Sequence, residues 1–271
     1  MPELPEVETI KRQLAKRIIG KKIKAVEVRL PKLVRADIKT FKKAVIGAKV
    51  KGIRRRAKLL IWELDNGWAL VMHLKMSGQI IYKGKDNKHT HLIYYFTDGS
   101  KIIHNDLRQF GYVKLVPLQK LEDLLEKEEA YGPEPLNKEF TLKIFEEILK
   151  KYPNKKIKPL LMDQKVVAGI GNLYADEILF GAGALPTRLV KNIKTEEMAK
   201  VYKKIIEILK LAIKHRGTSA DLYIDAEGKK GNFVPKLKVY GREGRKCNCG
   251  GIIKRIKIGS RSAHFCPACQ K

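Results

Sequence analysis

The chain has 271 residues, of which 44% are hydrophobic, so it can bury one large core or two modest ones and is not a disordered protein. No apolar run approaches the roughly 20 residues that span a bilayer, and the acidic, proline-punctuated N-terminus does not resemble a secretory signal, so we expect a cytoplasmic protein. The 57 Lys and Arg outnumber the 29 Asp and Glu, and the net charge of +28 favours a polyanionic partner such as a nucleic acid.

The first predicted element is an amphipathic helix over residues 3–19. Val7, Ile10, Leu14 and Ile18 recur at helical spacing and would share one buried face. Several glutamates lie in its first turns, where the positive end of the helix dipole favours anions.

Residues 22–118 predict many short strands. Alternating and β-branched runs such as Leu59–Leu64 and His91–Phe96 are separated by turn signals, including Asp98-Gly99-Ser100. Close turns between short strands indicate a sandwich or barrel-like β domain. Gly132-Pro133-Glu134-Pro135 then breaks the pattern in the manner of a linker.

The second half predicts helices followed by a short ribbon. Thr141 and Thr195 are expected to cap helices, a small-residue turn at 167–172 precedes another helix, and residues 216–235 are glycine-rich and irregular. We therefore expect an α+β fold with a β domain at 1–131, a helical domain at 132–235 and a metal-binding β-hairpin at 236–271.

All four cysteines lie in the tail, as Cys247, Cys249, Cys266 and Cys269. Two close pairs separated by 16 residues are typical of a tetrahedral structural zinc site, whose four thiolates leave no open position for chemistry. The first pair is Cys-x-Cys and not the usual Cys-x-x-Cys. The alternative is four free thiols on a reduced tail.

Five motifs occur in a fixed order along the chain. They are MPELPEVET at Met1–Thr9, HLKMSG at His73–Gly78, DLRQFG at Asp106–Gly111, the segment Asp163–Glu177, and the tail pieces Val239–Gly244 and Arg261–Pro267. Together they resemble the formamidopyrimidine-DNA glycosylases, which belong with endonuclease VIII to a wider group. The chain departs from the family pattern at Lys75, where glycine is usual, and at Leu107 and Gln109.

The resemblance implies a fold and an activity. The fold is an N-terminal β-sandwich with flanking helices, a helix-two-turn-helix domain and a zinc-bearing β-hairpin. The activity is that of a bifunctional DNA glycosylase and abasic-site lyase for oxidised purines in base excision repair. It acts through an N-terminal proline Schiff base and β,δ-elimination. The expected partner is double-stranded DNA with oxidised bases or abasic sites. One structural zinc, a monomer and a bacterial cytoplasm are also implied.

The resemblance also implies the catalytic residues. Once Met1 is removed, the secondary amine of Pro2 can attack C1′ of the deoxyribose, because a terminal amine is partly uncharged near pH 7. Glu3 would move protons, Glu6 would brace the N-terminus against the helix-two-turn-helix segment, Lys58 would bind phosphate beside the lesion, and Arg261 would assist at the hairpin tip. Taken alone, each has an ordinary alternative: proline is common at position 2, and Lys58 could belong to a solvated basic turn with Arg54–Arg56.

DNA contact is implied for seven residues. Met76, Arg108 and Phe110 would fill the gap left by the extruded base, and the remaining four would contact the backbone: His73, Asn172, Tyr240 and Arg261. The alternatives are core packing for Met76 and Phe110 and a helix N-cap for Asn172. In the family, the segment matching 216–235 folds over the flipped base; here the match is looser, which leaves the lesion preference open.

Three rival functions remain. The same chemistry on oxidised pyrimidines, as in endonuclease VIII, is disfavoured by Leu4, where that branch tends to have glycine. A zinc-ribbon DNA-binding protein without catalysis is disfavoured by Pro2, Glu3 and Lys58. An RNA-binding ribosome factor accounts for the charge but not for the five motifs.

Overall fold

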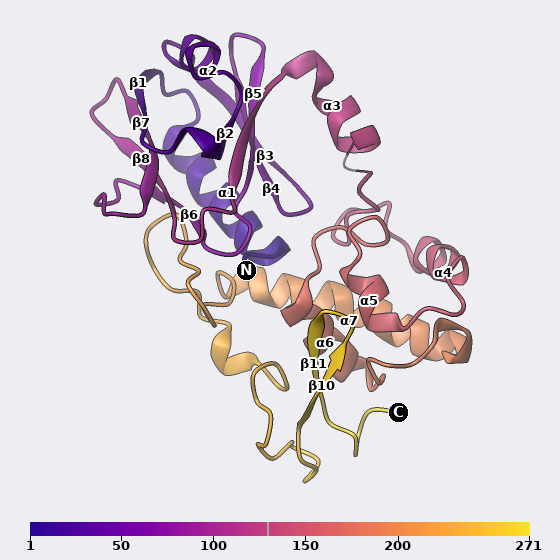
Figure 1. Cartoon of the computed structure of the whole chain (residues 1–271). Helices are drawn as coiled ribbons and strands as arrows, with labels where there is room; N and C mark the ends of the chain where they lie inside the picture. The colour runs from indigo at the N-terminus through magenta and orange to yellow at the C-terminus, as the bar shows by residue number, and fades with distance from the viewer. Residues whose placement is uncertain (129) are drawn as a thin grey trace. The chain divides into compact units, whose positions relative to one another are not determined.

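The computed structural model describes residues 1–128 and 130–271, and the chain divides into two compact units (Figure 1). The first unit comprises Met1–Glu129 and Ile213–Val234, and the second comprises Ala130–Ala212 and Pro235–Lys271. This division differs from the three expected parts, because residues 213–234 leave the helical segment to join the β domain and the cysteine-bearing tail lies with the helices. Among the described residues, no helix is long and apolar enough to span a membrane.

Two sheets form the first unit. One has four antiparallel strands in the order β1 (Ile23–Val28), β7 (Thr90–Phe96), β8 (Lys101–Asp106) and β6 (Gly78–Tyr82). The other has five strands in the order β2 (Val34–Arg35), β9 (Tyr112–Pro117), β5 (Trp68–His73), β4 (Leu59–Leu64) and β3 (Val50–Arg56), with only β2 and β9 parallel. The helices of this unit are α1 (Leu4–Ile18), α2 (Ile38–Val45) and α3 (Leu121–Asp123), with short 3-10 turns at Pro31–Leu33 and Leu118–Lys120 and a π-helical turn at Leu124–Glu128.

The apolar face of α1 joins both sheets in one hydrophobic core. Val7, Ile10, Leu14 and Ile18 have no exposed surface, which confirms the face predicted from their spacing. They share the core with Trp62 of β4 and with residues of β1, β5, β6 and β7, and Figure 1 shows α1 running alongside these strands. Burial of four large aliphatic side chains at roughly 2 kcal/mol each is the main force that holds α1 in place.

Residues 213–234 join the first unit through contacts with α1. Tyr223 lies in the same core, the backbone N–H of Ala226 donates to Gln13 (2.8 Å), and the backbone N–H of Thr218 donates to Glu6 (2.8 Å). The segment also folds on itself around Asp225, a fully buried carboxylate that Arg216 binds at 2.8 Å. These contacts explain why the segment does not extend the helical domain.

The second unit combines helices with a hairpin. Its helices are α4 (Leu142–Lys150), α5 (Ile157–Met162), α6 (Asn172–Ala182) and α7 (Thr195–Lys214), with 3-10 turns at Val190–Asn192 and Val234–Lys236 and a hairpin of β10 (Lys254–Ile258) and β11 (Arg261–Phe265). Thr141 caps α4 as predicted, since its side chain accepts from Ile144. The predicted cap at Thr195 is wrong: Thr195 is the first residue of α7, and Glu197 accepts the backbone N–H of the preceding Lys194.

Acid should weaken the first unit through His104. This residue of β8 is fully buried, neither ring nitrogen has a hydrogen-bond partner among the described residues, and burial lowers its pKa to about 4. Because the pKa of His104 is lower in the folded protein than in the unfolded chain, unfolding takes up a proton at acidic pH. The contribution of the neutral ring to the free energy of unfolding is therefore present above about pH 6.5 and is lost as the pH falls towards 4. From pH 7 to pH 5 we expect His104 to cost about 2 kcal/mol of unfolding free energy.

Urea unfolding at both pH values checks this expectation. The His104→Leu variant should lose less stability than the parent between pH 7 and pH 5. Equal losses in the two proteins would show that His104 is not the group that titrates.

Candidate functional site

The residues that follow Met1 at the N-terminus of α1 are buried and hydrogen-bonded, while Met1 itself is exposed. Pro2, Glu3 and Glu6 are all buried. Glu3 is the N-cap and forms a capping box with Glu6, whose carboxylate accepts the backbone N–H of Glu3 at 2.8 Å. The other oxygen of Glu6 accepts the N–H of Thr218 at 2.8 Å, so one side chain joins the chain end to the segment 213–234. The ammonium of Met1 lies 3.5 Å from Asp221, and while Met1 is present the Pro2 nitrogen is an amide.

Lys58 lies in the turn between β3 and β4 and is only 6% exposed. The alternative of a solvated basic turn is wrong for its neighbour Arg55, which is buried against Glu8 of α1 at 3.0 Å and also donates to the carbonyl of Ala57. Hydrogen bonds from Arg12 and Arg55 lower the pKa of Glu8 below its usual value despite the opposing effect of burial. A buried ion pair therefore connects α1 to the strand end that leads into the turn of Lys58. The basic sequence at 54–58 did not indicate this contact.

The side chains of Met76 and Phe110 are exposed, so the alternative of core packing is wrong for both. Met76 is 37% exposed between β5 and β6, and Phe110 is 54% exposed between β8 and β9. The guanidinium of Arg108 lies 5.0 Å from the Phe110 ring centre. Leu107, one of the residues that differ from the family motif, is also 49% exposed and adds apolar surface to the loop of Phe110. Exposed apolar side chains at two loop tips suit insertion between bases.

His73 is held as a neutral hydrogen-bond donor. Burial, together with the charges of Lys75, Lys58 and Arg35, lowers its pKa to about 3. Its Nδ1 accepts the backbone N–H of Lys75 at 2.9 Å, which leaves the hydrogen on Nε2. A neutral imidazole among three cations can donate to a phosphate without a change of protonation.

Asn172 is the first residue of α6 in the second unit. The N-cap is Gly171, so a simple capping role for Asn172 is wrong. Its side-chain oxygen is buried and has no hydrogen-bond partner among the described residues. The position at a helix N-terminus, where backbone N–H groups favour anions, is compatible with a phosphate contact.

Consecutive acids of α6 hold both arms of the cysteine-bearing tail. Glu177 accepts the backbone N–H groups of Lys238, Val239 and Tyr240, each at 2.9 Å. Burial raises the pKa of Glu177, and the three donors oppose that rise. One carboxylate thus positions the segment that carries Tyr240.

The neighbouring Asp176 holds the hairpin that carries Arg261. It is fully buried, binds Lys158 at 2.7 Å and accepts from both the backbone N–H and Nδ1 of His264 at 2.9 Å. Lys158 also donates to the carbonyl oxygen of Ser262, next to Arg261. Sequence reasoning missed these roles of Asp176 and Glu177, although two adjacent acids on an otherwise apolar helix were a visible signal.

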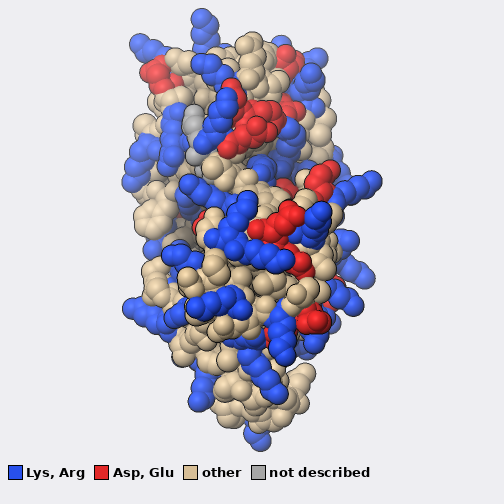
Figure 2. All heavy atoms as spheres, turned by 90° about the vertical axis from the view of Figure 1, so that its right-hand side faces the viewer, with Lys and Arg blue, Asp and Glu red and all other residues tan. Residues whose placement is uncertain are grey.

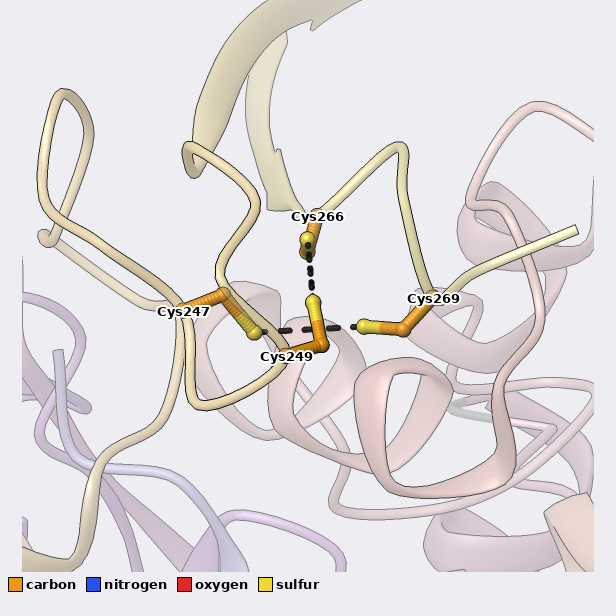
Figure 3. A group of neighbouring side chains, drawn as sticks. All are labelled: Cys247, Cys249, Cys266 and Cys269. Atoms are coloured by element: carbon orange, nitrogen blue, oxygen red, sulfur yellow. Dashed lines mark hydrogen bonds between the residues drawn. The ribbon is translucent and has the colours of Figure 1, made fainter.

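The four cysteines converge on one point in the second unit (Figure 3). Their sulfurs all lie within 4.8 Å of one another, with Cys247 and Cys269 3.9 Å apart and Cys249 and Cys266 3.5 Å apart. Zinc–sulfur bonds of 2.3 Å in a tetrahedron require sulfur separations of about 3.8 Å. The residues therefore fit one zinc ion, which would hold the tail together.

The short Cys-x-Cys spacing is accommodated by a tight turn. The backbone N–H of Gly250 donates to the carbonyl of Cys247, and Gly250 has a φ of 88°, which favours glycine. A β-carbon at Gly251 would lie 2.9 Å from the sulfur of Cys266. The N–H of Gly251 lowers the pKa of Cys249 to about 7, and a low pKa favours the thiolate that binds metal.

Three family models match the chain in sequence order. The formamidopyrimidine-DNA glycosylase N-terminal domain matches residues 1–113, the H2TH domain of the same enzymes matches 131–223, and the zinc finger found in FPG and IleRS matches 246–271. The chain belongs to the formamidopyrimidine-DNA glycosylase family. Its class of activity is that of a DNA glycosylase, and its tail is an FPG-type zinc finger.

Relatives agree over the whole length. The formamidopyrimidine-DNA glycosylases of Heliobacterium modesticaldum and Pelotomaculum thermopropionicum are 43% and 41% identical, with 100% of this chain and 100% and 99% of those proteins covered. Among solved structures, a Lactococcus lactis FPG variant with Fapy-dG-containing DNA is 38% identical with a TM-score of 0.93 over 100% of both chains. The Lactococcus lactis protein with abasic-site DNA is 38% identical with a TM-score of 0.93 over 99% of both. The expected fold class is confirmed.

The zinc site predicts a defined response to loss of one thiol. We expect one zinc ion per chain, and Cys266→Ala should lose it because three thiolates hold zinc less tightly than four. Elemental analysis of the purified proteins measures this, with Ser260→Ala at the hairpin tip as the control. A Cys266→Ala protein that still carries a full equivalent of zinc would contradict a four-thiolate site.

The turn between β5 and β6 holds Lys75 in a left-handed backbone conformation. The φ of this residue is 49°, in the left-handed region that costs a residue with a β-carbon roughly 1–2 kcal/mol. We expect Lys75→Gly to unfold with a free energy about 1 kcal/mol higher than Lys75→Ala, because both lack the charge but only alanine keeps the strain. Denaturant unfolding of the pair measures the difference, and equal stabilities would show that the turn is not strained.

Proposed function

We propose that this glycosylase removes oxidised purines, such as 8-oxoguanine and formamidopyrimidines, and then cuts the strand as an abasic-site lyase. The observation that carries the proposal is the buried position of Pro2, which directly precedes the capping box of Glu3 and Glu6. Removal of Met1 converts the Pro2 amide into a secondary amine at the positive end of the α1 dipole. Burial and the dipole both favour the uncharged, nucleophilic form of that amine.

The covalent chemistry follows from a secondary amine. The nitrogen of Pro2 bonds to C1′ of the deoxyribose, and the bond from C1′ to the base breaks, so the base leaves with the electron pair and a proton. The bond from C1′ to the ring oxygen O4′ then breaks, the oxygen takes up a proton, and the lone pair of the nitrogen forms the iminium. The iminium acidifies the protons on C2′, and loss of one of them expels the 3′ phosphate. A second elimination expels the 5′ phosphate, and water then releases Pro2. No oxidant or reductant is needed.

The remaining residues have supporting tasks in this proposal. Glu3 protonates the leaving groups and the sugar oxygen, while Lys58 and Arg261 neutralise phosphates and supply protons during elimination. His73, Asn172 and Tyr240 bind the backbone of the damaged strand. Glu6 holds the chain end against Thr218.

Double-stranded DNA is the proposed partner. Lys and Arg side chains cover more of the face in Figure 2 than Asp and Glu do, in keeping with the net charge of +28. A surface of this kind releases counterions on binding a duplex, so affinity should fall steeply with salt. The Lactococcus lactis structures contain Fapy-dG, abasic-site or oxidised-pyrimidine DNA, which makes damaged duplexes the substrates to test.

A borohydride trap tests the mechanism. Protein whose mass shows loss of Met1 is incubated with a duplex that carries 8-oxoguanine opposite cytosine, then reduced. We expect a covalent protein–DNA product that peptide mapping places at Pro2. Pro2→Gly should lose most of the product, since it replaces the secondary amine with a primary one and frees the chain end.

The same experiment on other duplexes separates the alternatives. If the covalent product forms only with oxidised pyrimidines, the proposed mechanism stands and the proposed substrate class is wrong. Lys16→Arg, at an exposed position of α1 away from the amine, serves as a control for folding. Absence of a product on lesion and abasic duplexes, from protein that lacks Met1, would refute the lyase.

A further inference from the structure

A buried hydrogen-bond network joins the two loops that carry Met76, Arg108 and Phe110. The Asp106 carboxylate is fully buried at the end of β8, and the hydroxyl of Ser77, 4% exposed, donates to it at 2.5 Å. The other oxygen of Asp106 accepts the backbone N–H of Gly111 at 2.7 Å. The oxygen of Ser77 in turn accepts the backbone N–H of Arg108 at 2.8 Å.

Each loop is closed tightly around this pair. The Met76 loop closes through a hydrogen bond from Gly78 to the carbonyl of Leu74, and a β-carbon at Gly78 would lie 2.6 Å from that carbonyl oxygen. A β-carbon at Gly111 would lie 2.9 Å from the Asp106 carboxylate. The loops therefore have little room to move apart while Ser77 and Asp106 remain bonded.

The network also orients the exposed side chains. Ser77 follows Met76 directly, and its oxygen holds the backbone of Arg108, whose guanidinium lies 5.0 Å from the Phe110 ring centre. Gln109 between them has a φ of 55°, a left-handed conformation that persists only where the surroundings enforce it. The hydrogen bonds from the backbone N–H of Gly111 to Asp106 and from that of Arg108 to Ser77 hold Gln109 in this conformation.

We propose that Ser77 and Asp106 are positioning residues that make the two loops enter the duplex as one unit and set the preference for the base opposite the lesion. This inference rests on the proposed function, because it concerns how the gap left by the extruded base is filled. A buried carboxylate with two donors is a rigid anchor, since each lost bond leaves a buried polar atom without a partner. Loss of the anchor would let Met76 and the Arg108–Phe110 pair sample positions independently.

The test compares Ser77→Ala with Ser100→Ala. Ser100 is a matched control, because it too is 4% exposed and its hydroxyl donates to a carboxylate, that of Asp98, at 2.6 Å in the turn between β7 and β8. Three readouts are made: excision of 8-oxoguanine opposite cytosine and opposite adenine, fluorescence of a 2-aminopurine beside the lesion, and cleavage of a single-stranded abasic oligonucleotide.

We expect Ser77→Ala to slow excision opposite cytosine about 10-fold, because a fixed misplacement of about 1 Å can cost about 100-fold and a loosened loop still samples the parent's position part of the time. The ratio of rates opposite cytosine and adenine should narrow, and the 2-aminopurine signal of base unstacking should fall. Cleavage of the single strand, which has no gap to fill, should stay within about 2-fold of the parent. Ser100→Ala should match the parent in all three.

A second variant keeps the test decisive if Ser77→Ala folds poorly. Asp106→Asn preserves the side-chain volume but cannot accept from both Ser77 and Gly111, so it should show the same pattern in weaker form. The inference is overturned if the Ser77 variant keeps the parent's opposite-base ratio and fluorescence, or loses all three activities equally. If the parent protein itself excises no lesion, the proposed function fails instead.

Discussion

A nucleophile at the end of a chain can act only if that end is held in place, and the burial of α1 supplies this constraint. Four aliphatic side chains of α1 lie in the core of the first unit, and the capping box fixes the first turn. Terminal residues of most proteins are poorly ordered unless they are tied down. Here the helix, Glu6 and the ion pair between Glu8 and Arg55 hold the chain end, the turn of Lys58 and the segment from Thr218 against one scaffold.

In the second unit, buried carboxylates hold the cysteine-bearing tail in place. A short two-stranded hairpin is barely stable alone, and the FPG-type zinc finger is stabilised by its metal at one end. At the other end Asp176 and Glu177 bind backbone N–H groups and the Lys158 ammonium, which compensates for burying their charge. The zinc ligands and the two acids together determine where Tyr240 and Arg261 are presented.

Several non-glycine residues with a left-handed backbone conformation lie in loops of the first unit. Lys75 precedes Met76, Gln109 lies between Arg108 and Phe110, and Arg216 begins the segment that closes on α1. Strain of this kind is stored where a loop must keep one shape for function. Lys75 also adds a cation beside His73, where its charge contributes to the lowered pKa of the imidazole.

The periodicity of the sequence determined most of the secondary structure. The α1 face, the short strands and the cysteine pairs follow local rules of spacing, and the motif order was enough to predict the family and its fold class. Expectations failed where the answer depended on distant contacts. Residues 213–234 were assigned to the helical part because a glycine-rich segment carries no periodic signal of the surface on which it packs.

Only the tertiary structure decided which polar residues are structural anchors. Arg55 in a basic run, Asp106 at a strand end and the acids of α6 all look like surface residues in the sequence, because a charged side chain gives no local indication that its partner lies on another element. Burial is a property of the whole fold, and the cost of burying a charge is met by partners far away in the chain. The sequence therefore determined the residues available for chemistry, while the tertiary structure decided which of them are held, exposed or neutral.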